Sequence, residues 1–391
     1  MYYFTKTLTF LFLILTIISC ASNLTFSISE EKSDFFIEKP GLKLNFNRLP
    51  KEINIFLLSF ENPILTSELL NGLMNNYFYY KKEANYTPTL NIQDLSRKKI
   101  EQCNFVEYRK NYSLVFILDK SLENIPSDCK ENLLSLRGLL ILFDSDININ
   151  NPNLTQLDVK RLNDSKDLLK YAREQEDKNS IIIDDLETKD KNLLKKIWKG
   201  LDGTTAKTTT AHKGIEDEDL LSKILLIEQS KVRGKKLSRA TSSPIEYIPR
   251  SRQDIDLLIL SVSITKARSL KPALEYNFAE SIKVYLVPDW KSNTNYTNLE
   301  KDLEGSIIID MPFILNSSAP FLKIEEENRN RLFAMGYDAY ELSILLNSSV
   351  KKNNFSFIGM TGKLILKPDK NISRKSLKVE IIDGKFKSLG Y

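Results

Sequence analysis

The sequence predicts an α/β fold built from two doubly wound lobes, in which helices cover both faces of parallel sheets. Apolar runs of strand length recur along the chain, and they lack the in-out alternation of a sheet with one wet face. A helical pattern follows most of these runs, which is typical of β-α-β units. About eight such units are more than one sheet accommodates comfortably, so we expect two sheets and therefore two lobes.

The first half of the chain begins this alternation. Residues 53–58 form a compact apolar run, and Asn62-Pro63 after it is a helix-start signal. The other elements expected here are strands at 114–118, 139–143 and 180–183 and helices at 65–74, 167–176 and 193–198. Residues 202–214, which are rich in Thr and Lys, are predicted to form a loop.

The second half continues the alternation and ends in short strands. Residues 216–233 form a strongly amphipathic helical pattern, and residues 231–239 add a basic cluster, which we interpret as a solvated helix end. The remaining expected elements are strands at 255–260, 284–287, 306–309, 363–366 and 378–382 and helices at 265–276 and 328–346. Asp383-Gly384 is a hairpin signal near the C-terminus.

Composition excludes several function classes. The 56 basic and 51 acidic residues leave a net charge of +5 that is spread along the chain, which argues against a dedicated nucleic-acid binder. The single histidine, His212, lies in the Thr-rich segment, and no Cys-x-x-Cys spacing occurs. Zinc sites built on Cys and His, and a Ser-His-Asp triad with a supported histidine, are therefore excluded. We expect no catalytic residue, no metal and no cofactor.

The N-terminus carries a lipoprotein signal. Lys6 precedes an apolar run at residues 8–18, which is too short to span a bilayer comfortably. The run closes with Ile-Ile-Ser-Cys at residues 17–20, which is a lipobox. A plain signal peptide with Cys20 incidental is one alternative interpretation, and an uncleaved N-terminal anchor is another.

The lipobox predicts how the chain is organised. We expect a lipoprotein signal peptide over 1–19, lipid attachment at Cys20, a tether over 20–48 and a two-lobed body over 49–391. Two or more acyl chains on Cys20 would make membrane anchoring stable. Ala21-Ser22, with no Asp, follows the cysteine and favours the outer membrane, so the body would face the periplasm of a bacterium.

The body retains two cysteines. Cys103 and Cys129 flank a predicted strand, so an oxidising periplasm would allow a disulfide between them. Two buried, unpaired thiols are the alternative.

Several multi-residue motifs over residues 250–390 occur in a recognisable order. They are Ser-Arg-Gln-Asp-Ile-Asp at 251–256, Lys-Ala-Arg at 266–268, Lys-Pro-Ala-Leu at 271–274, Asp-Leu-Glu-Gly at 302–305, Asp-Met-Pro at 310–312, Arg-Leu-Phe-Ala-Met-Gly-Tyr-Asp-Ala-Tyr at 331–340, and Phe-Ile-Gly-Met-Thr-Gly-Lys-Leu at 357–364, with Arg374 and Leu377 beyond. This order resembles the C-terminal domain of the LppC/LpoA-type lipoproteins, the outer-membrane activators of class A penicillin-binding proteins.

The resemblance implies a type-I periplasmic-binding-protein-like fold, with two lobes joined by three crossovers. Mapped on this chain, lobe one takes about 50–150 and 304–350, and lobe two takes about 151–303 and 351–391. Larger members of the family carry an N-terminal helical-repeat domain, which we expect to be missing here because only the tether separates Cys20 from the first strand.

The resemblance also implies a role in peptidoglycan synthesis, and hence in cell wall biogenesis and cell shape. The lipoprotein would bind and stimulate a bifunctional synthase, and it would not itself be an enzyme. Aromatic side chains in loops are candidate partner contacts, namely Tyr247, Trp290 and Tyr296.

Two other functions compete with this one. A lipid-anchored solute-binding protein of a transporter would hold a small ligand between the lobes, and Ser59, Asp119 and Asp184-Asp185 lie at suitable strand ends. A cell-wall hydrolase is disfavoured because no usable His/Cys constellation exists. A filled cleft would favour the regulator, and an open cleft with converging polar groups would favour the receptor.

The motifs also have packing roles. Most of the 331–340 motif is expected to fill a core, with Gly336 allowing close packing of its helix on a sheet. Gly359 and Gly362 are expected at tight turns where φ is positive.

Overall fold

The chain divides into two units, residues 1–34 and residues 35–391. The computed structural model describes parts of the second unit: residues 46–58, 64–95, 105, 108–118, 131–133, 135–143, 153–185, 190–211, 216–241, 246–287, 290, 296–297, 299–315, 329–348, 356–367 and 371–391. The predicted signal peptide, Cys20 and most of the tether lie outside these residues, as do Cys103, Cys129 and His212.

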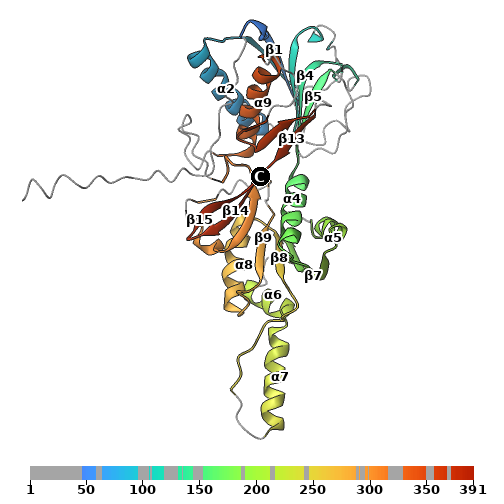
Figure 1. Cartoon of the computed structure of the whole chain (residues 1–391), viewed down its shortest axis with the longest axis vertical. Coiled ribbons are helices and arrows are strands. Elements are labelled where there is room, and N and C mark those ends of the chain that lie inside the picture. The colour runs from blue at the N-terminus through green and yellow to red at the C-terminus, as the bar shows by residue number, and fades with distance from the viewer. Residues whose placement is uncertain are drawn as a thin grey trace, which may run out of the picture. The chain divides into compact units, whose positions relative to one another are not determined.

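Two mixed sheets with helices form the described body (Figure 1). The first sheet has the strand order β11-β12-β13-β5-β4-β3-β1-β2. Its strands are β1 (Glu52–Leu58), β2 (Thr89–Asp94), β3 (Tyr112–Ile117), β4 (Arg137–Phe143), β5 (Leu154–Val159), β11 (Ser356–Ile358), β12 (Lys363–Leu366) and β13 (Asn371–Lys375). The six strands β2, β1, β3, β4, β5 and β13 are adjacent in this order, and each adjacent pair is parallel. Strand β12 then pairs antiparallel with β13, and β11 pairs antiparallel with β12.

The second sheet has the order β15-β14-β10-β9-β8-β6-β7. Its strands are β6 (Asn179–Asp185), β7 (Thr204–Ala211), β8 (Leu257–Ser261), β9 (Lys283–Leu286), β10 (Ser306–Asp310), β14 (Leu377–Ile382) and β15 (Lys385–Gly390). The strands from β6 to β10 are parallel, and β14 and β15 add an antiparallel edge. Two apolar clusters on opposite faces bury most side chains of the four inner strands β6, β8, β9 and β10, which is why these four strands do not alternate.

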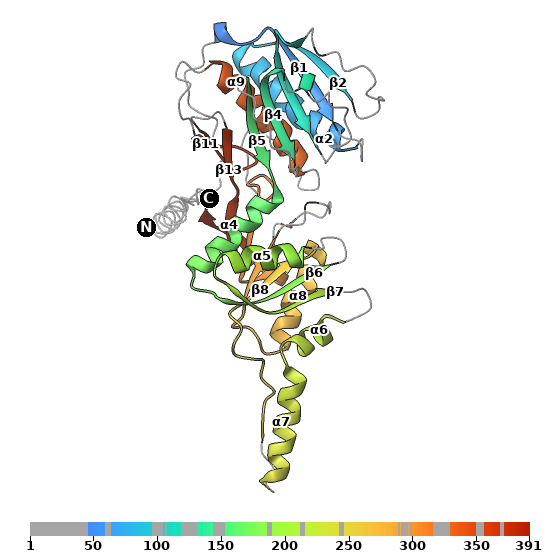
Figure 2. The ribbon, with the colours of Figure 1, turned by 90° about the vertical axis from the view of Figure 1, so that its right-hand side faces the viewer.

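Helices cover both faces of the second sheet, as the doubly wound prediction requires. In the first sheet, α2 (Ile64–Ala84) and α9 (Arg331–Ser348) pack side by side in one core. In the second, α4 (Arg161–Glu174) and α5 (Lys191–Gly200) share one core, and α6 (Asp217–Ile224) and α8 (Ile264–Tyr276) share the other. Figure 2 shows α4 and α5 on one side of β8 and α8 on the other. The structure also has two single-turn 3₁₀ helices, η1 (Phe46–Arg48) and η4 (Lys301–Leu303).

Three crossovers join the sheets, as predicted. The chain passes from β5 to α4, from β10 to α9 and from β13 to β14. The lobe limits differ from those expected, because β10 belongs to the second sheet and β5 and β11–β13 belong to the first. Parallel pairing of β10 with β9, and of β13 with β5, decides this membership. Strands β5 and β13 are far apart in sequence, so no local pattern indicates that they pair.

Two sequence-based predictions of secondary structure were wrong. The Thr-rich segment predicted as a loop forms β7, because threonine suits an edge strand whose exposed face needs no apolar residues. The helix predicted over 216–233 breaks at Leu226, which adopts φ +60°, and α7 (Ile227–Ala240) starts after it. Its basic cluster therefore lies along α7 and not only at a helix end.

Glycines let two helices approach closely. A Cβ on Gly336 of α9 would lie 2.0 Å from the Leu69 carbonyl oxygen of α2, and a Cβ on Gly72 would lie 1.9 Å from that of Phe333. Gly336 thus packs on a helix and not on a sheet, contrary to the prediction. Among the described residues, none of the helices has the length and apolar content to cross a membrane.

Candidate functional site

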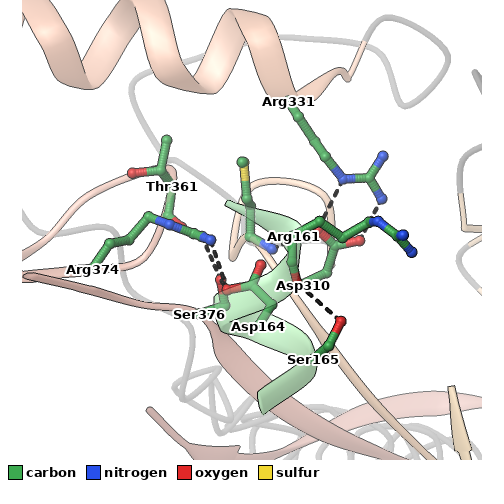
Figure 3. A network of polar contacts seen from close by, with 9 residues as sticks. Arg161, Asp164, Ser165, Asp310, Arg331, Thr361, Arg374 and Ser376 are labelled. Atoms are coloured by element: carbon green, nitrogen blue, oxygen red, sulfur yellow. Dashed lines mark hydrogen bonds and ion pairs between the residues drawn. The ribbon is translucent and has the colours of Figure 1, made fainter. Parts of the chain in front are cut away.

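Buried polar side chains tie the three crossovers together (Figure 3). Arg374, on β13, donates from Nη2 to Oδ1 of Asp164 on α4 over 2.6 Å. Both side chains are only 2% exposed. Ser376, between β13 and β14, donates its hydroxyl proton to the same carboxylate oxygen over 2.9 Å. The first and third crossovers are therefore held by one buried ion pair.

A second ion pair joins the two ends of the remaining crossover. Arg331, the first residue of α9, donates from Nε and Nη2 to the two carboxylate oxygens of Asp310, the last residue of β10. The Asp310 side chain is fully buried, and its Oδ1 also accepts the Met311 amide over 2.7 Å. This bidentate geometry fixes where α9 starts relative to the second sheet.

Asp338, within α9, extends the network into the β11–β12 turn. Its carboxylate accepts the amides of Met360 and Thr361 over 2.9 and 2.7 Å and the Thr361 hydroxyl over 2.6 Å. Gly359 is needed because a Cβ there would lie 2.5 Å from Asp338 Oδ2, a close approach and not the positive φ we expected. Gly362 does have a positive φ of 146°, as predicted. Arg374 Nη1 then donates to the Thr361 carbonyl oxygen over 2.9 Å, which connects this turn to the first ion pair.

Burial dominates the electrostatics of these acids. It raises the pKa of the Asp338 carboxyl to about 6, although hydrogen bonds from Thr361 and Met360 act in the opposite direction. Burial also raises the pKa of the Asp164 carboxyl, against the lowering effect of Arg374. Both groups are therefore costly to bury, and their partners compensate only part of that cost.

Trp290 lies where the two sheets meet. Its ring stacks on Phe143, the last residue of β4, with centroids 5.3 Å apart and planes 15° apart. The guanidinium carbons of Arg331 and Arg374 lie 6.0 and 5.7 Å from the Trp290 ring centroid. Trp290 follows β9 by four residues, so the stack joins the carboxyl ends of strands from both sheets. Ligands of doubly wound folds bind at such ends, and here packed aromatic side chains lie at this point.

The acids expected at a ligand-binding edge have structural partners. Asp184, at the end of β6, is 1% exposed and accepts the Lys191 amide at the start of α5 over 3.2 Å. Asp185 accepts the amide of Ser263, the residue that caps α8, over 2.9 Å. Ser59 and Asp119, the other candidates, lie outside the described residues.

A cavity of about 600 Å³ lies between β5, α4 and β13. Cations and acids line it together, including Lys166, Lys367 and Lys375 with Asp158 and Asp167. Small-molecule sites are lined mainly by apolar side chains with a few convergent polar groups, so this lining does not define a ligand site. In the described part of the chain, no three His, Cys, Asp or Glu side chains are grouped as a metal site would need.

The structure separates the three aromatic residues predicted as partner contacts. Trp290 packs between the sheets, as described above. Tyr296 is packed edge-to-face against Phe386 with centroids 5.5 Å apart, and burial raises the pKa of its hydroxyl. Tyr247 is 37% exposed and packs its ring over Gly234 of α7, so of the three it alone presents a large surface to solvent.

Sequence reasoning singled out the motifs of Asp310, Arg331 and Arg374 but missed Asp164. This aspartate lies in the first turn of a polar helix, and nothing near it in sequence indicates that it is buried. Its partner is 210 residues away in sequence, so no local signal could have revealed it.

The fold and its crossovers define a two-lobed protein of the periplasmic-binding-protein type. A structure described as "a putative branched-chain amino acid ABC transporter from Rhodospirillum rubrum" matches with a TM-score of 0.59 at 12% identity, covering 86% of this chain and 99% of that one. The "LpoA (YraM) C-domain from Haemophilus influenzae, a regulator of PBP1A" matches with a TM-score of 0.55 at 17% identity, covering 86% and 99%. These likenesses establish the fold.

Sequence comparison identifies the family. The family model "LppC putative lipoprotein" matches residues 184–382, and the chain belongs to this lipoprotein family. The penicillin-binding protein activator LpoA of Photobacterium profundum is 27% identical over 175 residues, which are 43% of this chain and 28% of that relative. The chain thus matches less than a third of the length of this curated relative. The family resemblance drawn from the motifs is confirmed.

Proposed function

We propose that this protein is an outer-membrane lipoprotein that binds a class A penicillin-binding protein and stimulates peptidoglycan synthesis. One observation carries the proposal: in a chain of the LppC family, the Trp290–Phe143 stack lies where a small ligand would otherwise bind. A relative that matches over part of its length is named a penicillin-binding protein activator, which supports the same function. The protein would act through its surface and not through catalysis.

The hinge supports this function over that of a solute receptor. A receptor closes around its ligand by moving one lobe against the other, which requires hinge segments that absorb the change. Here two ion pairs with buried carboxylates lie at the crossovers. Opening them would expose or unpair charges that are buried in the present arrangement, so they favour a single lobe arrangement.

A binding and activity assay with the full-length chain in detergent tests the proposal. We expect an immobilised class A synthase to retain the chain and the chain to raise its rate of glycan polymerisation severalfold. Amino acids and sugars should leave the melting temperature unchanged. No retention by any class A synthase of the organism, together with a thermal shift from one of these solutes, would instead establish the transporter alternative.

The anchor and the cysteines need their own tests. We propose a signal peptide over 1–19, acylation of Cys20 and a tether over 20–48, with the body facing the periplasm. Labelled palmitate should enter the wild-type protein, and Cys20→Ser should abolish the labelling and release the chain from the outer-membrane fraction. Alkylation before and after reduction will distinguish a Cys103–Cys129 disulfide from two free thiols.

A further inference from the structure

The exposed apolar side chains of the described body concentrate around α7. Eleven large apolar side chains are exposed in the described part of the chain, and six of them lie on α7, on the segment 246–250 or at the end of α8. These six are Val232, Leu237, Tyr247, Ile248, Tyr276 and Phe278. Ile248 is 69% exposed, Tyr276 70% and Phe278 60%. Segment 246–250 packs on α7 through Tyr247, and Ser251 Oγ donates to the Phe278 carbonyl oxygen over 3.4 Å, so these side chains lie on adjoining elements. Apolar side chains exposed together mark an interaction surface, whereas single exposed apolar residues need no explanation.

Helix α7 also carries cations that form no ion pair within the described part of the chain. Helix α7 carries five basic residues and one acid, Glu228, which pairs with Lys231 over 2.6 Å. The other four, Arg233, Lys235, Lys236 and Arg239, are exposed and form no ion pair with any described residue. We call these four cations and the six apolar side chains the α7 patch.

Direct contacts hold helix α7 and segment 246–250 together. A Cβ on Gly234 would lie 2.3 Å from the Tyr247 ring, so glycine lets segment 246–250 pack directly on the helix. The Arg250 amide donates to Ser230 Oγ over 3.0 Å. Only Ile227 of α7 is buried, and Figures 1 and 2 both show the helix leading away from the second sheet. The helix is thus fixed at one end while most of its surface faces solvent.

We propose that the α7 patch is the surface that docks on the synthase, at a site where acidic side chains surround an apolar centre. The inference rests on the proposed function and names the contact. Aromatic and Arg side chains dominate binding energies at protein interfaces, and the α7 patch supplies both. Its unpaired cations complement an acidic surface and accelerate association with it.

The distribution of the apolar residues favours a protein partner over a lipid surface. Val232 and Leu237 are five residues apart, and at about 100° per residue they lie about 140° apart around the helix axis. A helix that lies in a membrane interface needs one continuous apolar face, and α7 lacks it.

The test compares charge reversal on two helices in the full-length chain. The α7 variant is Lys235→Glu, Lys236→Glu and Arg239→Glu, and the matched control on α5 is Lys195→Glu, Lys196→Glu and Lys199→Glu, where all three lysines are also exposed. We expect the α7 variant to lose at least about tenfold in affinity for the synthase and the α5 control to change less than about twofold. Raised salt should weaken wild-type binding and have less effect on the α7 variant.

A second pair of variants tests the apolar part. Ile248→Ser should reduce affinity for the synthase at least about threefold. The control is Leu193→Ser on α5, where the Leu193 side chain is 42% exposed, and it should have little effect. Ile248→Ser removes no buried contact, so it keeps the test valid if charge reversal lowers the yield of folded protein.

The outcomes separate this inference from the proposed function. If wild type binds no class A synthase, the proposed function itself fails. If wild type binds, and the charge-reversal variant of α7 and Ile248→Ser both bind as tightly as wild type, the function stands and the α7 patch is not the contact. If wild type binds phosphatidylglycerol vesicles through these same cations while its synthase affinity is insensitive to them, the α7 patch is a lipid-binding surface and the inference is overturned.

Discussion

The crossovers and the α7 patch both contain arginines. At the crossovers they are paired with buried carboxylates, whereas on α7 they are exposed and have no acidic partner among the described residues. At the crossovers, Arg374 and Asp164 are each 2% exposed and bonded to each other. On α7, four cations are exposed and have no acidic partner among the described residues. Buried charges are retained only when paired, and they restrict the body to one arrangement of its parts. Exposed, unpaired charges contribute little to that arrangement and stay available to another molecule.

The largest expected effect comes from breaking the buried pair. Arg374→Ala leaves Asp164 buried without its counter-charge, so the free energy of unfolding should fall by about 3–5 kcal/mol. Urea unfolding measures this. Arg252→Ala, which removes an ion pair whose acid is 59% exposed, is the control and should cost less than about 1 kcal/mol. Equal losses in the two variants would show that the crossover pair is no more important than a surface pair.

The next effect depends on pH. The pKa of Asp338 is about 6 in the folded protein, above the ordinary 3.8, so the folded state binds the proton more tightly than the unfolded state. The stability contributed by this group is therefore full below about pH 4 and is lost as pH rises through about 6. Since one pKa unit corresponds to about 1.4 kcal/mol, the loss is up to about 3 kcal/mol.

A comparison with Asp338→Asn isolates this contribution. The difference in unfolding free energy between wild type and variant should shift against wild type as pH rises from about 4 to about 7. Groups common to both proteins, including the neighbouring Glu341, cancel in this difference to first order. A difference independent of pH would mean that Asp338 does not titrate in this range.

A smaller effect is expected where two helices meet without charges. Gly336→Ala would place a Cβ 2.0 Å from the Leu69 carbonyl oxygen, so α2 and α9 must separate, at a cost of about 1–3 kcal/mol. Gly200→Ala, with nothing within 4 Å of the added atom, is the matched control. Thermal unfolding should show Gly200→Ala unchanged or stabilised by less than about 1 kcal/mol. A tolerated Gly336→Ala would contradict the close helix contact.

The smallest stability effect should come from α7. The triple reversal of Lys235, Lys236 and Arg239 should change the free energy of unfolding by less than about 0.5 kcal/mol, because these side chains are exposed and form no ion pair with a described residue. The same substitutions should have the strongest effect on synthase binding. A large loss of stability would show that the helix packs against the chain itself, and the contrast with the crossovers would disappear.

Sequence patterns predicted local structure well where whole strands are buried. The strands β1, β6 and β8 contain apolar runs because both faces of each sheet are covered. The pattern failed at β7, where an edge strand needs no apolar side chains. It also failed at Leu226, because apolar residues continue across the break between α6 and α7 and hide the change of helix direction.

Sequence alone was sufficient for the α/β class, the doubly wound arrangement and the family, since these depend on the order of apolar runs and on motifs read along the chain. Only the tertiary structure decided which strands share a sheet, which carboxylates are buried and paired, and that Trp290 packs between the sheets while Tyr247 does not. The physical reason is distance along the chain. Asp164 and Arg374 pair across 210 positions, and β5 and β13 pair across a similar distance. The energies of such pairs depend on burial that no local segment encodes.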